Sequence, residues 1–264
     1  MLNSIKFLGT AGARVVVTRQ LRSSGGIWIS LNDTNILIDP GPGCLVKCAK
    51  SKPRLDPLKL DGIVLTHKHL DHSGDINIMI EAMTDGGFKK RGILFAPQDA
   101  LEGKDPVVFH YLRSFLKKIQ KLTEGGRYQI GNIFFTTPKK HQHGVETYGL
   151  NFYSSNISIS LISDTAYFNG LEDHYKGSIL ILNVVRFKPT EGVDHLSFED
   201  AKRIIQINHP KLAILNHFGM TMLRAKPWQL AQKLQEEIGI RIIAANDGML
   251  INLDEYGARE NDKG

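Results

Sequence analysis

The sequence has little cysteine and no long hydrophobic run. Only Cys44 and Cys48 occur, in C-L-V-K-C. They cannot form a disulfide framework and are two ligands short of a structural zinc site, so we expect both to lie on a helix. No apolar run reaches the roughly eighteen residues of a membrane span, and M-L-N-S-I-K-F-L-G-T lacks the features of a secretory signal. These absences predict a cytoplasmic protein with no membrane partner.

Neither internal repeats nor low-complexity linkers divide the 264 residues. With 42% apolar residues, the chain can bury one large core, and we expect a single domain over residues 1–254 with a frayed tail at 255–264. The net charge of +6 permits an anionic partner without requiring one, because the lysines are scattered. Lys117, Lys118 and Lys121 are interpreted as the solvated face of a helix. RNA therefore stays open as a partner.

Short apolar segments that end in loops follow one another from the start of the chain. S-I-K-F-L-G-T predicts a strand that runs into a glycine turn, and G-I-W-I-S-L with N-I-L-I-D-P predicts a hairpin around N-D-T-N. D-G-I-V-L-T predicts another strand. Ile76, Met79, Ile80 and Met83 then recur at helical spacing, so a helix is expected there.

A second strand-rich series begins near residue 127. Y-Q-I-G-N-I-F-F-T-T, Y-G-L-N-F-Y, S-I-S-L-I-S-D and S-I-L-I-L-N-V-V each predict a strand. Two helices follow, one with Ser197 as N-cap and Asp200 at the third position, and one with Pro227 in its first turn. Strand-rich halves with helices outside them predict an α/β fold of two stacked sheets.

The stretch T-H-K-H-L-D-H-S-G-D, residues 66–75, concentrates metal-binding side chains at the end of a predicted strand. Imidazole and carboxylate groups suit zinc, manganese or iron, and a catalytic centre leaves a position open for water. His67 and His69 alternate in an extended segment and can point the same way, whereas Asp71 and His72 lie past a bend. One loop can therefore contribute ligands to two adjacent metals.

Four ligands cannot complete two metal sites, so further ligands are expected at the ends of other strands. His143 precedes a predicted strand, Asp164 ends S-I-S-L-I-S-D, and His217 ends K-L-A-I-L-N-H. His141, two residues before His143, is the alternative to it as a ligand.

These motifs resemble the metallo-β-lactamase superfamily. The resemblance covers nearly the whole chain, from L-G-T-A-G and L-I-D-P-G-P-G through the histidine loop to I-S-D-T, L-N-H-F-G and A-N-D-G-M-L-I-N-L. It implies an α/β fold, an αββα sandwich of two mixed β-sheets with helices on the outer faces, and a dinuclear metal site at one edge of the sheets. It also implies a ligand set: His67, His69 and His143 for the first metal, Asp71, His72 and His217 for the second, and Asp164 as the bridge. Asp39 would support the histidine loop by hydrogen bonds.

His195, in H-L-S-F-E-D-A, is similar to a histidine of the phosphodiesterase branch, which includes the tRNA 3′-end nucleases and the phosphodiesterases of phosphonate breakdown. There the matching histidine reaches the phosphate as a general acid or stabilises developing charge. The alternative is that His195 lies at the start of a helix and makes only a local hydrogen bond there. Arg22, in R-S-S-G-G, is a further candidate to bind the substrate phosphate, with an ordinary turn as the alternative.

Two departures weaken the tRNA interpretation. Only twenty residues separate His143 from Asp164, too few for the protruding arm of the tRNA nucleases. Asn183 and Arg186 stand in the strand where those nucleases carry an acidic residue. The compact spacing resembles the phosphonate type, although the cysteine-rich structural zinc site of that type is missing here.

We therefore expect a metal-dependent hydrolase in which two divalent cations share a hydroxide that attacks a phosphodiester. Zinc is the first choice, with manganese or iron(II) as alternatives, and Asp71 and His195 are the expected catalytic residues. The expected substrate is small or cyclic and nucleotide-like. The alternatives are a tRNA 3′-end-type endoribonuclease and a hydrolase of carboxylic esters, lactones or thioesters at the same metals; a di-iron oxidoreductase would need a flavin-binding domain. A homodimer is compatible with the sequence.

Overall fold

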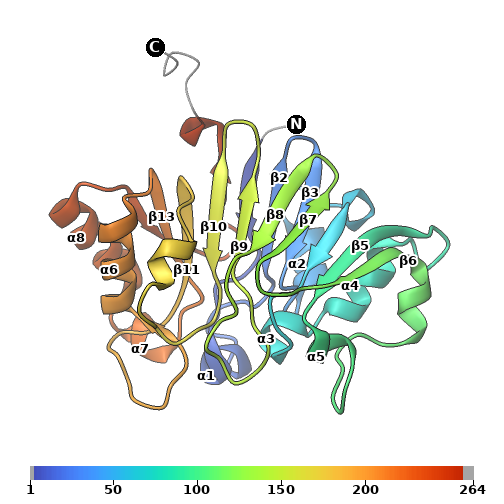
Figure 1. Ribbon diagram of the computed structural model, residues 1–264, viewed down its shortest axis with the longest axis horizontal. Coiled ribbons are helices and arrows are strands. Elements are labelled where there is room, and N and C mark those ends of the chain that lie inside the picture. The colour runs from blue at the N-terminus through green and yellow to red at the C-terminus, as the bar shows by residue number, and fades with distance from the viewer. Residues whose placement is uncertain (1–2, 258–264) are drawn as a thin grey trace.

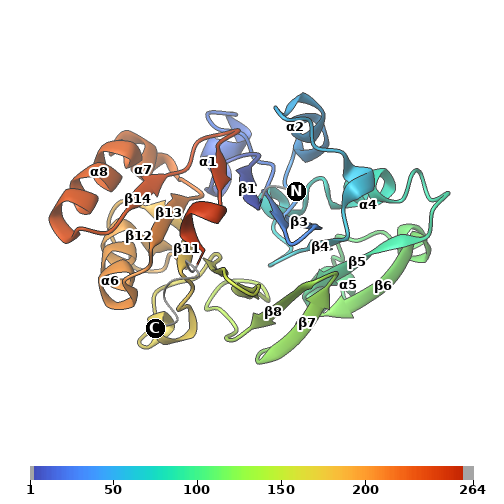
Figure 2. The same ribbon diagram turned by 90° about the horizontal axis from the view of Figure 1, so that it is seen from above.

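Two β-sheets pack face to face between two layers of helices (Figure 1). The computed structural model describes residues 3–257. Seen from above, α6, α7 and α8 lie beyond one sheet, and α2 and α4 lie beyond the other (Figure 2). This arrangement confirms the predicted αββα sandwich. No helix within residues 3–257 is both long and apolar enough to cross a membrane.

The first sheet has the strand order β15-β1-β2-β3-β4-β5-β6 and mixes antiparallel with parallel pairs. Its strands are β1 (Ser4–Phe7), β2 (Ile27–Leu31), β3 (Thr34–Ile38), β4 (Gly62–Val64), β5 (Arg91–Ala96), β6 (Leu116–Lys121) and β15 (Leu250–Asn252).

The second sheet has the order β14-β13-β11-β10-β9-β8-β7, and β12 pairs with β11 outside this path. Its strands are β7 (Gly126–Ile130), β8 (Ile133–Thr137), β9 (Leu150–Tyr153), β10 (Ser158–Ile162), β11 (Ile179–Arg186), β12 (Leu196–Ser197), β13 (Leu212–Asn216) and β14 (Ile242–Ala244).

Helices connect and cover these strands. The α-helices are α1 (Ala13–Thr18), α2 (Cys44–Lys50), α3 (Leu70–Ser73), α4 (Ile76–Met83), α5 (Gln98–Leu101), α6 (Phe198–Asn208), α7 (Met220–Arg224) and α8 (Pro227–Ile238). The 3₁₀ helices are η1 (Pro57–Lys59), η2 (Tyr111–Phe115), η3 (Leu171–His174) and η4 (Asp254–Tyr256).

Three buried clusters account for the layers. Residues such as Ile29, Phe135 and Ile181 fill the space between the sheets. A second cluster packs α2 and α4 against the outer face of the first sheet, and it includes both cysteines, which lie on α2 as expected. A third packs α6 and α8 against the outer face of the second sheet. Burying apolar area on both faces of each sheet is the main stabilisation of such a sandwich.

Local sequence signals explain several element boundaries. The predicted hairpin of β2 and β3 turns at Asn32 and Asp33, whose φ angles are 47° and 58°. Positive φ at both central residues is typical of the tight turn that matches strand twist, and Asn and Asp tolerate it well. α6 begins at the predicted capping box, in which the Asp200 N–H donates to Ser197 Oγ and the Ser197 N–H donates to Asp200 Oδ2. Pro227 opens α8 as predicted.

Three expectations were wrong. Lys117, Lys118 and Lys121 lie on the edge strand β6 and not on a helix; charged lysines on an edge strand hinder pairing with another chain. Residues 128–137, expected as one strand, belong to the hairpin of β7 and β8, which turns at Gly131 with φ 52°. Residues 255 and 256, expected as part of a frayed tail, belong to η4, and Tyr256 packs in the core between the sheets. Residues 258–264 lie outside the described residues.

The capping box of α6 gives a test of this local account. Ser197→Ala removes one half of it, and we expect the free energy of unfolding to fall by about 1 kcal/mol, because the Asp200 N–H loses its acceptor. Urea denaturation followed by circular dichroism measures the change. Ser155→Ala, at an exposed loop position, is the control and should change stability by less than about 0.5 kcal/mol. Equal losses in the two variants would contradict the role of the cap.

Candidate metal centre

The predicted site residues converge at one edge of the sandwich, where parallel strands end. The histidine loop follows β4, Asp164 follows β10, and His217 follows β13 directly. β10, β11 and β13 run parallel, so their carboxyl ends meet at the same edge. Figure 1 shows this edge beside α1 and α3. Loops at the carboxyl ends of parallel strands are the usual place for a site in layered α/β folds.

Four side chains gather around His72 and His217. His72 Nε2 and His217 Nε2 lie 3.2 Å apart, and Asp71 Oδ2 lies 3.8 and 3.5 Å from them. Asp164 Oδ2 lies 3.5 and 3.3 Å from the same two nitrogens. Ligands placed about 2.0–2.1 Å from a tetrahedral zinc ion lie about 3.3 Å from one another. The group therefore fits a small divalent cation at its centre.

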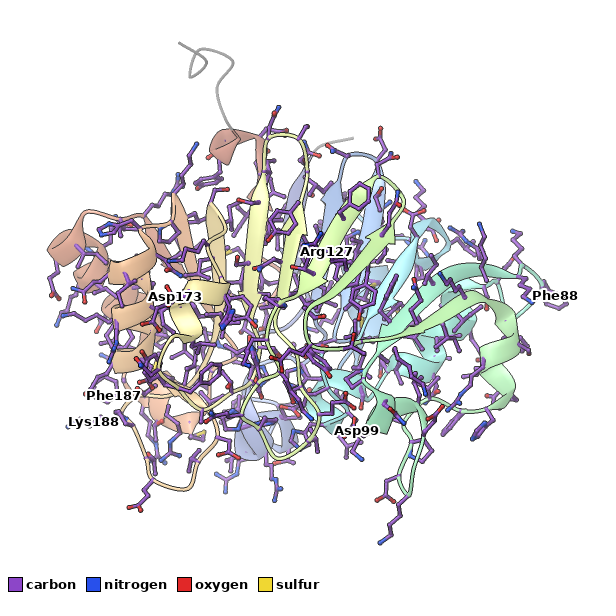
Figure 3. All side chains as sticks on the ribbon, viewed as in Figure 1. Phe88, Asp99, Arg127, Asp173, Phe187 and Lys188 are labelled. Carbon is purple, nitrogen blue, oxygen red and sulfur yellow. The ribbon has the colours of Figure 1, made fainter. Side chains whose placement is uncertain are left out.

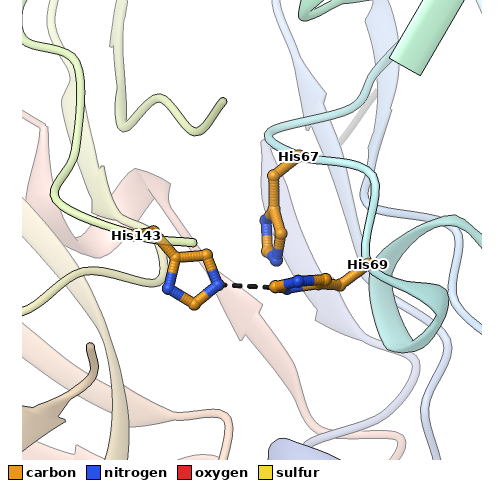
Figure 4. Close-up of side chains that lie close together, drawn as sticks. All are labelled: His67, His69 and His143. Atoms are coloured by element: carbon orange, nitrogen blue, oxygen red, sulfur yellow. Dashed lines mark hydrogen bonds between the residues drawn. The ribbon is translucent and has the colours of Figure 1, made fainter. Parts of the chain in front are cut away.

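His67, His69 and His143 form a second group next to the first (Figure 4). His69 Nδ1 and His143 Nε2 are 3.0 Å apart, and one nitrogen from each of the three rings lies within 4.8 Å of the others. His67 Nε2 is buried, has no hydrogen-bond partner among the described residues, and lies 3.9 Å from Asp164 Oδ2. A cation here would supply the partner that this nitrogen lacks. Asp164, a member of the first group, thus also lies beside the second.

Asp39 supports the histidine loop from behind. Its Oδ1 accepts a hydrogen bond from the Thr66 N–H at 2.6 Å, and its Oδ2 accepts one from Thr66 Oγ1 at 2.7 Å. His72 Nδ1 lies 2.9 Å from the same Oδ2. Because a carboxylate can only accept, the ring proton is placed on Nδ1, which leaves Nε2 free to bind a metal. With these bonds made, Asp39 fits the supporting role that the resemblance implies, although it also lies within 4.8 Å of His67 and His72 ligand atoms.

A second connection joins the histidine loop to the loop of His143. Asp99, at α5 on the same edge of the molecule, accepts a hydrogen bond from the Glu146 N–H at 3.2 Å, while Glu146 Oε2 accepts one from the Asp99 N–H at 3.2 Å (Figure 3). Lys68, between the two histidines, lies 3.8 Å from Asp99 Oδ2. The reciprocal pair therefore ties α5 to the loop of His143, and Lys68 connects α5 to the histidine loop.

Burial and mutual charge set the protonation of the pocket. Burial lowers the pKa of His67 well below its usual value, so its ring is neutral and able to bind a metal. Burial would raise the pKa of Asp164, but His217 and His72 beside it hold the pKa well below the usual range. Burial would lower the pKa of His72, yet Asp71, Asp164 and Asp39 raise it well above normal. The surroundings of His72 Nε2 thus favour a positive charge.

His195 reaches the same pocket. Its Nδ1 is buried, lies 3.4 Å from Asp164 Oδ2, and has no hydrogen-bond partner among the described residues. Burial lowers the pKa of this ring. The alternative of a local hydrogen bond at the start of α6 is not what the structure shows, since Ser197 caps that helix. The ring is therefore available to a ligand in the pocket.

Arg22 and His141 are committed to protein partners. The Arg22 guanidinium donates to Asn246 Oδ1 at 2.9 Å and to Thr10 Oγ1 at 3.4 Å. His141 is buried, with Nδ1 3.2 Å from the Asp164 carbonyl oxygen and Nε2 2.7 Å from the Tyr175 hydroxyl. Burial lowers the pKa of His141 to about 4, so the ring is neutral, donates from Nδ1 and accepts at Nε2. Both ring nitrogens are thus occupied without a metal.

Sequence reasoning missed several residues that shape the site. Thr66 Oγ1 lies 2.9 Å from Ser163 Oγ and so joins the two strand ends that carry His67 and Asp164. A Cβ on Gly12 would lie 2.2 Å from the His217 carbonyl oxygen, and one on Gly41 would lie 2.0 Å from the Asp71 carbonyl oxygen. Glycine is needed where backbones approach this closely. Their motifs, L-G-T-A-G and D-P-G-P-G, were visible in the sequence, but the contacts were not.

Comparison with known proteins agrees with the fold. Residues 34–218 match the family model of the beta-lactamase superfamily domain. An uncharacterized protein of Methanocaldococcus jannaschii is 32% identical, with 94% of each chain covered. The crystal structure of the metallo-beta-lactamase fold protein YhfI from Bacillus subtilis has a TM-score of 0.76 at 19% identity, covering 95% of this chain and 99% of that one.

Two further structures share the fold. A diphosphatase from the PhnP family has a TM-score of 0.69 at 19% identity, over 95% of this chain and 97% of that one. The short form of human tRNase Z has a TM-score of 0.65 at 15% identity, over 94% and 98%. The chain belongs to the metallo-β-lactamase superfamily, and its fold is that of a metal-dependent hydrolase with a His/Asp cluster suited to divalent metals.

The choice between His141 and His143 as a ligand can be tested by metal content. His143→Gln should lower the metal bound per chain, because it breaks the three-histidine group, whereas His141→Gln should leave it unchanged. Mass spectrometry of metals after gel filtration measures both. His141→Gln should instead lower the free energy of unfolding by about 1–3 kcal/mol, since it disturbs two buried hydrogen bonds. The reverse pattern, with metal lost only from His141→Gln, would rule out this assignment.

Proposed function

We propose that this protein is a metal-dependent phosphodiesterase that binds two divalent cations in the pocket. His67, His69 and His143 hold the first cation, Asp71, His72 and His217 hold the second, and Asp164 lies between them. The distances among Asp71, His72, His217 and Asp164 support this assignment. A set dominated by imidazole nitrogen favours zinc, with manganese or iron(II) as alternatives, since all three accept nitrogen and carboxylate ligands.

The position of His195 is the observation that favours phosphodiester hydrolysis in this proposal. When bound, two adjacent cations supply an activated water and neutralise charge on a phosphoryl group. The chain must then contribute a group for the leaving oxygen or for the charge that develops on phosphate. His195 is the one histidine of this pocket, among the described residues, that stands outside the two proposed ligand triads, and its Nδ1 still faces Asp164 Oδ2 at 3.4 Å. A ring at that place can donate a hydrogen bond to a substrate bound across both metals.

A small substrate fits the structure better than tRNA. Between His143 and Asp164 the chain forms only β9, β10 and short connections, so this region has no protruding arm. The PhnP-family structure is described as a diphosphatase, which supports a phosphate ester or anhydride as the substrate class. The net charge of +6 is compatible with an anionic substrate. We place the protein in the cytoplasm, and RNA and a homodimer remain proposals for its partners.

Hydrolysis of a carboxylic ester, lactone or thioester is the second candidate. The same metal pair can polarise a carbonyl group, so the ligands do not separate the two reactions. His195 favours phosphodiesters, because a phosphoryl group spreads negative charge over several oxygens and a donor at this position could stabilise one of them. A panel of bis-p-nitrophenyl phosphate, cyclic nucleotides, pre-tRNA, a lactone and a thioester separates the candidates. We expect turnover of the first two, and turnover of the thioester alone would overturn the proposal.

Replacing His195 tests its role directly. His195→Ala should keep the metal content of the parent protein and lower kcat on bis-p-nitrophenyl phosphate by about 10²- to 10⁴-fold, the usual share of a positioned proton donor. Metal analysis and steady-state kinetics on the same sample give both values. His209→Asn is a suitable control, because His209 is exposed and has φ 44°, a conformation that asparagine also adopts. Full activity in His195→Ala would remove this residue from the mechanism.

A further inference from the structure

A small polar cavity lies behind the second metal position. Its volume is about 30 Å³, and it extends from Asp71, His72 and His217 inward to Leu161, between the sheets. Three polar atoms in its lining are buried and have no hydrogen-bond partner among the described residues: Ser24 Oγ, Asn183 Oδ1 and Asn216 Oδ1. Their residues are only 3%, 5% and 5% exposed. Leaving three such groups unpaired would be destabilising, because each has lost its hydrogen bonds to bulk water.

The two amides face the same cavity because of strand register. Asn183 on β11 is paired with Asn216 on the neighbouring parallel strand β13. Paired residues of neighbouring strands lie about 5 Å apart and on the same face of the sheet, so one small molecule can contact both side chains. The orientation of Asn183 is fixed, because its Nδ2 donates to Asp164 Oδ1 at 2.8 Å. Its Oδ1 must therefore point away from Asp164.

The chemistry of the three groups selects the occupant. Two amide oxygens are acceptors only, and the Ser24 hydroxyl can donate. A water molecule donates two hydrogen bonds and accepts at least one, which satisfies all three groups at once. A cavity of this size holds one water, and a buried water needs two to four polar partners. A cation is disfavoured, because the second metal position is adjacent.

We propose that Ser24, Asn183 and Asn216 bind one buried water, and that this water holds Asn183 as a positioning residue for Asp164. Asn183 occupies Asp164 Oδ1, so Oδ2 is the oxygen that faces the metal positions. The distances agree: Oδ2 lies 3.3–3.9 Å from nitrogens of His67, His72, His195 and His217. The link to metals and the choice of water over a cation rest on the proposed function, whereas the three unpaired groups around the cavity do not.

Two experiments test this inference. In a high-resolution crystal structure, we expect one ordered water within hydrogen-bond distance of all three groups. In a zinc titration followed by calorimetry, Asn183→Leu should weaken binding of the second zinc ion by about 10- to 100-fold, the usual cost of losing a residue that orients a ligand. Ser24→Ala should weaken it less, because the amide bond to Asp164 remains.

A matched control separates this effect from general damage. Asn151 is also a buried asparagine of the second sheet, with its Oδ1 bound to Ser160 Oγ at 2.6 Å and its Nδ2 donating to the His174 carbonyl oxygen. Asn151→Leu should therefore lower stability and leave zinc affinity unchanged. Unchanged zinc affinity in Asn183→Leu would overturn the positioning role, and a dry cavity would overturn the water site. Failure to turn over any phosphodiester, with both results as expected, would sink the proposed function alone.

Discussion

The organisation of this site depends on one carboxylate oxygen. Asp164 Oδ2 lies 3.3–3.9 Å from nitrogens of four histidines, which come from the histidine loop, from the segment before α6, and from the end of β13. A buried carboxylate is costly unless positive charge or hydrogen bonds compensate it. The surrounding imidazoles hold the pKa of Asp164 low, so the charge is kept and must be balanced within the pocket. The contacts that position these histidines therefore also stabilise the buried negative charge of Asp164.

Strand ends and short side chains, rather than long side chains, hold this arrangement in place. Parallel strands end at one edge, and Asp39, Thr66 and Ser163 join those ends by hydrogen bonds of 2.6–2.9 Å. Asp39 and His217 have φ angles of 51° and 61°, which non-glycine residues adopt at a cost. Such conformations persist only where the surroundings determine them fully. The strain is consistent with a site whose geometry matters more than its local stability.

Local sequence signals predicted much of the fold and of the candidate site. The ligand motif, the β2–β3 turn, the capping box of α6 and Pro227 of α8 are each contained in a few adjacent residues. The prediction of a helix for the lysine-rich segment at 116–121 was wrong because this segment forms a strand by pairing with β5, which lies far away in sequence. The turn between β7 and β8 could have been predicted from the Gly131-Asn132 pair, which is typical of a hairpin turn. The prediction treated the residues on both sides as one continuous strand and so missed it. The cavity of Ser24, Asn183 and Asn216 depends on register between strands, which composition does not encode.

The neutral amide at position 183 also bears on the charge of the pocket. The pocket holds three carboxylates, those of Asp39, Asp71 and Asp164. With two divalent cations, the hydroxide that they would share and neutral histidines, these charges would balance. An acidic residue at 183 would make the pocket negative and would set a second carboxylate against Asp164 Oδ1, where Asn183 now donates a hydrogen bond at 2.8 Å. The amide thus holds Asp164 in place without adding a negative charge that would repel anions from the pocket.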